Sequence, residues 1–313
     1  MNFKEAAFLV SIVFLISGCT TTQTGAGLII EGFGPDLPEV FSGEEVTFSG
    51  RIRNTGSLTA TNVRATLLGL NDWYGAGRPI GKGGWIGTEK LPEEEECAYT
   101  SSGASLLPPN PQFSTAGGNM VCSWKYFAPS IPEGTLAYNP TMRVFYNYRS
   151  ETVKLISILP RGEMIRLQQS GRPLPGETKS ISMSPVRIDI ETPSIIRASG
   201  DSVEFQLRVT INNIDRGIAC YPDSLESCKN TNDNWNRIKI SLAMPDGITL
   251  SDCQEHMVLD LFHGTSNSVV CRAVASGISM DTPKQHTISV SGEYLYMLDM
   301  SAEITVKSSH SLR

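Results

Sequence analysis

The chain of 313 residues carries 26 basic and 32 acidic side chains, which gives a formal net charge of −6. This mild negative charge, with no basic stripe along the sequence, argues against nucleic acid as a partner. After the first residues no stretch is apolar enough to cross a bilayer, and the length suffices for two domains with cores of their own.

The first 26 residues are typical of an export signal followed by a tether. The apolar run from Ala6 to Ile16 is too short to span a bilayer alone and suits the hydrophobic part of a signal peptide. It closes on Ile16-Ser17-Gly18-Cys19, which resembles the lipobox of prokaryotic lipoproteins. The resemblance implies a signal peptide at 1–18, lipid attachment at Cys19, a polar tether at 19–26, and a place on the extracytoplasmic face of the cell membrane. An ordinary cleaved signal with a chance cysteine, or an uncleaved membrane anchor, are the alternatives.

Two stretches of the remaining chain match each other. Gly43 to Ile52 can be laid over Gly200 to Val209. In both, an acidic turn leads into alternating apolar and polar residues, which is the pattern of a half-buried strand. Both halves also finish on an expected strand, at 152–158 and at 301–307. The repeat therefore predicts a duplicated β-domain.

Many short strands, turn signals between them and almost no helical periodicity predict an all-β protein made of two tandem β-sandwiches. The expected domains are 27–159 and 184–308. A linker at 160–183 joins them, and within it 164–169 is expected to form a short strand or a turn of helix. Such a linker predicts limited motion between the two domains.

The most specific stretch runs from Glu31 to Leu70. It contains Asn54-Thr55-Gly56 between two expected strands, followed by the alternating Val63-Arg64-Ala65-Thr66-Leu67. It resembles the immunoglobulin-like domains of the cell-adhesion-related (CARDB-like) group in bacterial and archaeal surface proteins, where an Asn-x-Gly turn precedes such a strand. The second half of the chain resembles them only loosely. The resemblance implies tandem immunoglobulin-like sandwiches in a prokaryotic surface lipoprotein, and it brings no catalytic residue with it.

Six cysteines remain when Cys19 is set aside, an even number in a chain with an export signal, which favours disulfides. Zinc and free thiols are the alternatives, but no C-x2-C spacing occurs. Six cysteines allow fifteen pairings, so the repeat is needed to choose among them. The repeat predicts one bridge at a matching place in each half and one local loop, namely Cys97 with Cys122, Cys253 with Cys271, and Cys220 with Cys228.

An aromatic, glycine-rich insertion at 71–85 interrupts the strand pattern of the first half. Trp73, Tyr74 and Trp85 lie among its glycines and could present flat faces to a sugar ring or a partner protein. The alternative is that these aromatics fold back over the edge of the sandwich. A second insertion, from Leu107 to Gly118, is expected to be an exposed loop held at its base by a disulfide, either for recognition or as a solvated spacer.

The sequence predicts no catalytic residue, metal or cofactor. Its four histidines stand in no recognised motif, and the cysteines are assigned to disulfides. We therefore expect a non-catalytic, lipid-anchored binding or structural protein of the cell envelope, an adhesion or assembly module. Its expected partners are the membrane through the lipid, and envelope proteins or polymers or further copies of itself. The alternatives are a soluble-ligand or carbohydrate-binding receptor that uses the aromatic loop and, less readily, an envelope hydrolase.

Overall fold

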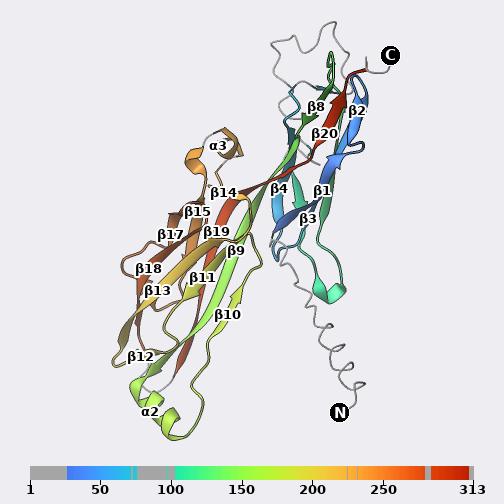
Figure 1. Ribbon diagram of the computed structural model, residues 1–313. Coiled ribbons are helices and arrows are strands. Elements are labelled where there is room, and N and C mark those ends of the chain that lie inside the picture. Colours follow the sequence, from blue (N-terminus) through green and yellow to red (C-terminus); the bar gives the residue numbers. More distant parts are fainter. Residues whose placement is uncertain are drawn as a thin grey trace, which may run out of the picture.

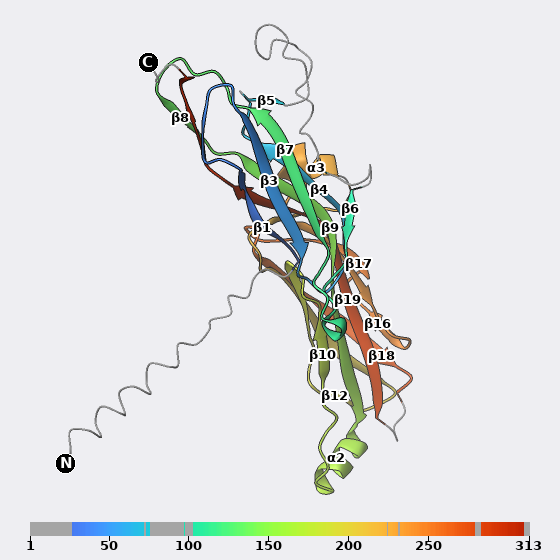
Figure 2. The same ribbon diagram turned by 90° about the vertical axis from the view of Figure 1, so that its right-hand side faces the viewer.

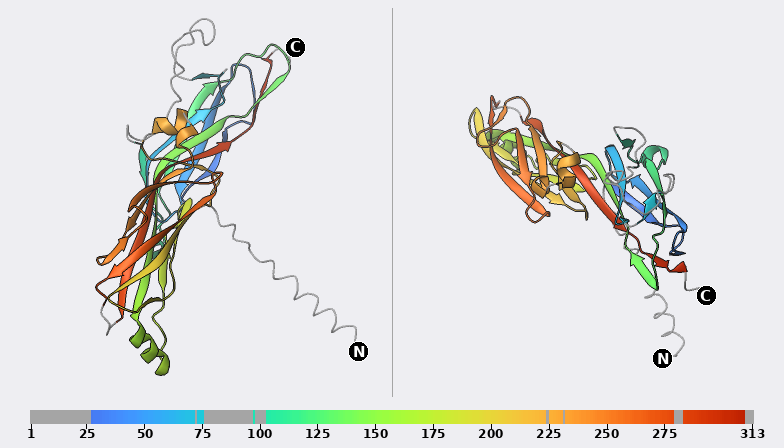
Figure 3. Two further views of the ribbon diagram at one scale, coloured as in Figure 1. Left: turned by 90° about the vertical axis from the view of Figure 1, so that its left-hand side faces the viewer. Right: turned by 90° about the horizontal axis from the view of Figure 1, so that it is seen from above.

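The computed structural model describes residues 27–71, 73–75, 97, 103–223, 225–230, 232–278 and 283–309. Within them the chain is all-β and folds into two sandwich bodies placed end to end (Figure 1). The turned views in Figures 2 and 3 show the same elongated arrangement. Among these described residues no helix is both long enough and apolar enough to cross a membrane.

We name the two bodies by the half of the chain that supplies most of each. The N-terminal body contains β1 (Leu28–Pro35), β2 (Glu39–Phe41), β3 (Glu45–Asn54), β4 (Ala60–Leu68), β5 (Tyr74–Gly75), β6 (Ala104–Leu106), β7 (Asn119–Phe127), β8 (Thr135–Tyr138) and β20 (Ile304–Lys307). The C-terminal body contains β10 (Thr178–Ile181), β11 (Val186–Glu191), β12 (Ile196–Ala198), β13 (Ser202–Asn213), β15 (Arg237–Ala243), β16 (Ile248–Leu250), β17 (His256–Asp260) and β18 (Ser266–Ser276). Two long strands, β9 (Thr141–Pro160) and β19 (Lys284–Ser301), belong to both.

The remaining elements are short. They are β14 (Ile218–Cys220), the helices α2 (Arg161–Gln169) and α3 (Leu225–Asn230), and the 3-10 turns η2 (Pro111–Phe113) and η3 (Asn232–Asn234). Helix α2 lies at the free end of the C-terminal body, and β20 lies near the opposite end of the molecule (Figures 1 and 2).

The strands β9 and β19 run antiparallel through the whole molecule and hold the two bodies together. They pair without interruption from Thr141↔Ser301 to Ile158↔Lys284, along all 18 residues of β19. On the outer side of β9 lie β4 and then β10 and β12, while β15 and β14 lie on the outer side of β19. A nine-stranded sheet therefore extends across both bodies.

A smaller sheet covers this shared sheet in each body. It has the order β1-β3-β7-β5 in the N-terminal body and β11-β13-β18-β16 in the C-terminal body. The expected alternation holds in both matching strands, because every second side chain in the middle of β3 and of β13 is buried. The repeat predicted from the sequence is thus reflected in the two covering sheets.

The structure differs from two independent domains on a linker. The expected linker at 160–183 contains α2 and also β10, which pairs with β9. The last strand, expected to close the second domain, instead lies in the N-terminal body, where β20 pairs with β2 and β8. One continuous cluster of buried apolar side chains extends through both bodies. Because the backbone pairing and the core both cross the boundary, the expected motion between domains is replaced by a stiff junction.

Candidate functional site

Four tyrosines occupy the junction of the two bodies, which we call the waist. The tyrosine cluster consists of Tyr146 and Tyr148 on β9 and Tyr294 and Tyr296 on β19. The register pairs Tyr148 with Tyr294 and Tyr146 with Tyr296, so all four side chains point to the same face of the shared sheet. They are at most 3% exposed, and neighbouring ring centroids lie 5.7 to 6.4 Å apart.

The hydroxyl groups of the tyrosine cluster show an approximate twofold relation between the bodies. Each hydroxyl oxygen accepts one backbone N–H at 3.1 to 3.4 Å. Two of these donors lie at the starts of the edge strands β1 and β11, and the other two lie in the loops that follow β3 and β13. The donors are Leu28 at the start of β1 to Tyr146, Val186 at the start of β11 to Tyr294, Leu58 to Tyr148, and Gly217 to Tyr296. Asn54 and Asn213, at the ends of β3 and β13, donate in the same way to the carbonyls of Leu58 and Gly217.

This cluster was not anticipated from the sequence. The signal that could have revealed it is a repeated Tyr-x-Tyr, at 146–148 and again at 294–296. Burial raises the pKa of Tyr148 to about 12, and it raises the pKa of Tyr294, of Tyr296 and of Tyr146 further above the ordinary range. The phenols are therefore neutral at physiological pH, and their arrangement is suited to fixing the two bodies rather than to proton transfer.

The backbone of Gly27 is held at the waist. Its carbonyl accepts the N–H groups of Thr55 (2.7 Å) and Gly56 (3.1 Å). Gly27 has a φ of 135°, and a Cβ at this position would lie 2.7 Å from Cδ of Pro185. Only glycine fits this close approach without displacement. The start of β1 is thereby fixed directly beside the start of β11.

The three expected disulfides are confirmed. Cys97 pairs with Cys122, Cys253 with Cys271, and Cys220 with Cys228, with Cα–Cα distances of 5.8, 5.5 and 5.9 Å. In the first two pairs the second cysteine lies on β7 or on β18, the matching strands of the covering sheets. Cys19, the expected lipid attachment residue, lies outside the described residues.

The expected aromatic loop is corrected at Trp73, because its side chain is fully buried. The indole ring packs edge-on against Phe48 (5.6 Å between centroids) and Tyr138 (5.5 Å). A ring enclosed in this way offers no face to a ligand, so Trp73 belongs to the core of the N-terminal body. The backbone of Tyr74 forms part of β5, which pairs with β7, and its side chain is not among those described. Trp85 lies outside the described residues.

Two exposed phenylalanines occupy matching turns near the waist. Phe113, in the loop between β6 and β7, is 74% exposed, and Phe262, in the turn between β17 and β18, is 70% exposed. The two turns correspond because Asn54 N–H donates to the Gly118 carbonyl (3.0 Å) and Asn213 N–H donates to the Thr265 carbonyl (2.7 Å).

The loop at 107–118 is internally bonded rather than a loose spacer, since Asn110 and Thr115 exchange backbone hydrogen bonds of 3.0 and 3.1 Å. Single exposed apolar side chains are common on protein surfaces, so the two turns are candidate contact points for a partner protein and not an apolar patch. The sequence had suggested the loop of Phe113 as a candidate, whereas nothing in it had marked Phe262.

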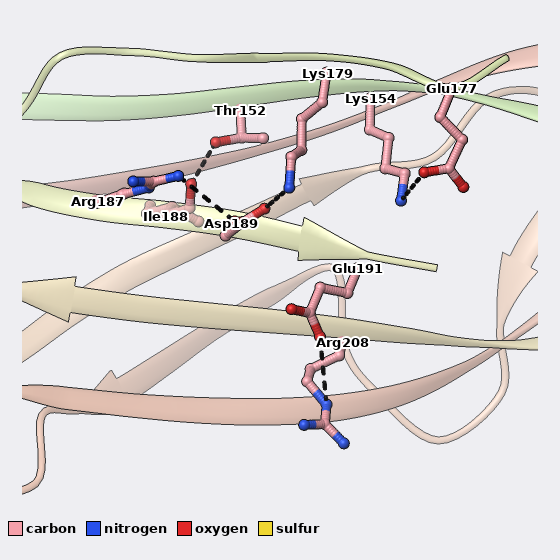
Figure 4. A network of polar contacts seen from close by, with 9 residues as sticks. All are labelled: Thr152, Lys154, Glu177, Lys179, Arg187, Ile188, Asp189, Glu191 and Arg208. Atoms are coloured by element: carbon pink, nitrogen blue, oxygen red, sulfur yellow. Dashed lines mark hydrogen bonds and ion pairs between the residues drawn. The ribbon is translucent and has the colours of Figure 1, made fainter. Parts of the chain in front are cut away.

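A network of polar contacts closes the side of the C-terminal body between β9, β10 and β11 (Figure 4). The Thr152 hydroxyl donates to the Ile188 carbonyl at 2.5 Å, and the Ser150 hydroxyl donates in the same way to the Val186 carbonyl. The side chain of Lys154, only 4% exposed, reaches Glu177 at 3.2 Å. Hydrogen bonds from β9 side chains to β11 carbonyls, rather than backbone pairing, therefore join these two strands along this side of the body.

The only histidine–hydroxyl contact among the hydrogen bonds of the described residues joins Ser241 Oγ and His256 Nδ1, 3.0 Å apart. These residues lie opposite each other in the pairing of β15 with β17, so the register accounts for their contact. Across the described part of the chain, no three His, Cys, Asp or Glu side chains gather in a way that could hold a metal ion.

Comparisons with known proteins give no family for this chain. No protein-family model and no curated protein matches it. Among solved structures, a mutant of Salmonella alpha-2-macroglobulin is 10% identical over 91% of this chain and 23% of its own, with a TM-score of 0.23. The collagen adhesin (CNA) from S. aureus is 7% identical over 89% of this chain and 92% of its own, with a TM-score of 0.11. The chain thus spans less than a quarter of the macroglobulin, and TM-scores this low carry no argument about function.

Proposed function

We propose that this chain is a non-catalytic, lipid-anchored binding or structural module on the extracytoplasmic face of a prokaryotic cell membrane. Cys19 carries the lipid, and the two sandwich bodies, immunoglobulin-like and similar to the CARDB-like group, form a stiff unit that meets envelope proteins, envelope polymers or further copies of the chain.

The observation that carries the proposal is the set of three disulfides within one chain. Disulfides persist in oxidising compartments and are rare in the cytosol, so they support a location outside the cytoplasm. The lipobox-like Ile16-Ser17-Gly18-Cys19 adds a means of attachment to the membrane there. A single acyl chain holds a protein only marginally, whereas two or more give stable anchoring.

The stiff junction supports a positional role over a catalytic one. A sheet that continues through both bodies keeps the turns of Phe113 and Phe262 at a fixed separation. Two fixed apolar contact points suit a module that bridges or aligns partners. The buried ring of Trp73 removes one of the three aromatics on which a sugar-binding receptor would depend.

The experiment that tests the proposal is detergent phase separation of the full-length protein expressed in a host that processes lipoproteins. The parent chain is expected in the detergent phase, and Cys19→Ser is expected in the aqueous phase. Thr20→Ser is the matched control, since it changes the neighbouring residue and leaves the thiol, and it should partition like the parent. Retention of Cys19→Ser in the detergent phase would contradict the lipid anchor.

The contact role is tested by cross-linking on intact cells followed by recovery of the protein. Phe113→Ser with Phe262→Ser is expected to reduce the yield of cross-linked partners or of self-cross-links while the thermal midpoint stays unchanged. Leu136→Ser, which replaces an exposed apolar side chain on β8, is the matched control. An unchanged cross-link pattern in the double variant would exclude the two turns as the contact surface.

A further inference from the structure

Gly27, the residue that follows the expected tether, lies at the middle of the molecule and not at either end. Gly27 is fixed beside Pro185, its carbonyl binds the backbone of Thr55 and Gly56, and the next residue, Leu28, donates its N–H to Tyr146 in the tyrosine cluster. We propose that a lipid on Cys19 therefore prevents the molecule from standing upright and holds it tilted toward a broadside posture, with the waist close to the lipid surface. This inference rests on the proposed lipidation of Cys19.

The tether is short. Cys19 and Gly27 are separated by eight positions in the sequence. Whatever its conformation, such a segment spans at most about 26–29 Å, because a fully extended chain advances about 3.3–3.6 Å per residue. The waist can therefore stand no higher than this above the point where the acyl chains enter the bilayer.

The end of the C-terminal body lies farther from the waist than the tether can reach. From Tyr146 the strand β9 continues to Pro160, and α2 follows beyond it. Fourteen steps along a strand amount to about 46 Å at about 3.3 Å per residue. If the molecule stood on this end, the waist would be too high for the tether. When the C-terminal body points toward the membrane, it must therefore tilt from the membrane normal by more than about 50°, the angle at which a 46 Å strand rises only 29 Å.

The opposite end gives a similar but weaker limit. From Tyr296 the chain continues along β19 and then β20 to Lys307, in the direction away from α2 (Figures 1 and 2). These eleven steps amount to about 36 Å, which again exceeds the reach of the tether. When the N-terminal body points toward the membrane, the tilt must exceed about 36°, so neither fully upright posture is compatible with an anchor at Cys19.

The side that faces the bilayer carries Gly27 and its neighbours. Ser57 and Met183 exchange backbone and side-chain hydrogen bonds next to Gly56, and Met183 is exposed. Met183 thus contributes one exposed apolar side chain to this side. The occupant we assign to this side is the lipid surface itself, held there by the length of the tether.

The test places a fluorophore at three sites of the full-length lipidated protein in vesicles that contain acceptor lipids. A ketone-bearing non-canonical residue replaces Met183 at the waist, Leu136 on β8 at one end, or Ile165 on α2 at the other, and all three native side chains are exposed. The native cysteines stay intact. Energy transfer to the acceptor lipids then reports the height of each site above the membrane.

The broadside posture predicts the strongest transfer from position 183 and transfer of similar size from positions 136 and 165. An insertion of roughly 20 Gly and Ser residues after Thr24 is expected to lower the transfer from position 183, because such a linker is flexible and longer. An upright posture would place the two ends at heights that differ by about 80 Å along the strands, so strong transfer from one end and none from the other would overturn the proposal.

A second arm separates this inference from the proposed function. A chain that starts at Cys19 is coupled through that thiol to vesicles with maleimide headgroups, and the same three labels are read. If the native protein carries no lipid, the proposed function fails. The label heights on the coupled chain still show whether an anchor at residue 19 prevents the molecule from standing upright. If the coupled chain stands upright, the geometry fails whether or not lipidation occurs in cells.

Discussion

The tyrosine cluster predicts a steep loss of stability at alkaline pH. In the unfolded chain these phenols have a pKa near 10, and in the folded protein burial raises the pKa of each one. A group whose pKa is raised on folding binds its proton more tightly in the folded state. Its full contribution to stability is thus present below pH 10 and is lost as the pH rises from 10 through the folded pKa.

The magnitude follows from the shift. For Tyr148 the pKa rises from 10.0 to about 12. Two pKa units correspond to about 3 kcal/mol, since each unit is about 1.4 kcal/mol. If none of the four tyrosines loses its proton until the protein unfolds, each one lowers the free energy of unfolding by about 1.4 kcal/mol per pH unit above pH 10. Together the four tyrosines then lower it by up to about 5 kcal/mol per pH unit. Because typical stabilities are about 5–15 kcal/mol, the protein should unfold cooperatively within a few pH units of 10.

The assay follows phenolate absorbance and far-ultraviolet circular dichroism along the same pH titration. The absorbance step of the cluster should coincide with the loss of β-structure. Tyr148→Phe should reduce the pH slope by about 1.4 kcal/mol per unit. It should also cost about 1–3 kcal/mol at neutral pH, because the partly buried N–H of Leu58 loses its acceptor. Ile240→Val, a core change on β15, is the control, and it should lower stability by about 0.5–1.5 kcal/mol equally at every pH.

The reasoning would be refuted if all the tyrosines titrated near pH 10 while the circular dichroism stayed native.

Three further predictions concern other parts of the fold. Trp73→Ala should lower the free energy of unfolding by about 3–5 kcal/mol in urea titrations, since it removes a fully buried ring, and a loss of partner binding without loss of stability would contradict its core position. Glu177→Ala should cost about 1–3 kcal/mol by leaving the buried Lys154 ammonium unpaired, whereas Lys154→Met should stay within about 1 kcal/mol of the parent, and equal losses would contradict this account. Replacing both Cys253 and Cys271 by Ser should cost about 3 kcal/mol, because the bridge closes a loop with a sequence separation of 18, and an unchanged thermal midpoint would count against it.

The features that could be predicted from the sequence are those determined by neighbouring residues. Alternation in Glu45–Asn54 and Ser202–Asn213 gave the matching strands, because the period of a strand is local. The disulfides followed from the repeat, since each pair closes a short segment within one half.

What could not be predicted depends on contacts between distant residues. Whether β9 pairs with β19 is a matter of register between strands more than a hundred residues apart, and no local pattern encodes it. For the same reason the sequence could not place β20 with β2. The side chain of Trp73 illustrates a different limit: a tryptophan among glycines has the same local pattern whether its ring is buried against Phe48 or exposed to a ligand.

The place of β20 has a consequence for how the chain acquires its fold. The N-terminal body needs both β20 and the second half of β19, which follow almost all of the rest of the described chain. Pairings between such distant segments form slowly, because a long loop must close before any contact compensates for its entropy. The early part of the chain therefore cannot complete its first sandwich while the later part is still being synthesised. Folding of the N-terminal body is therefore postponed until the residues of β20 are available, so that the two bodies form together.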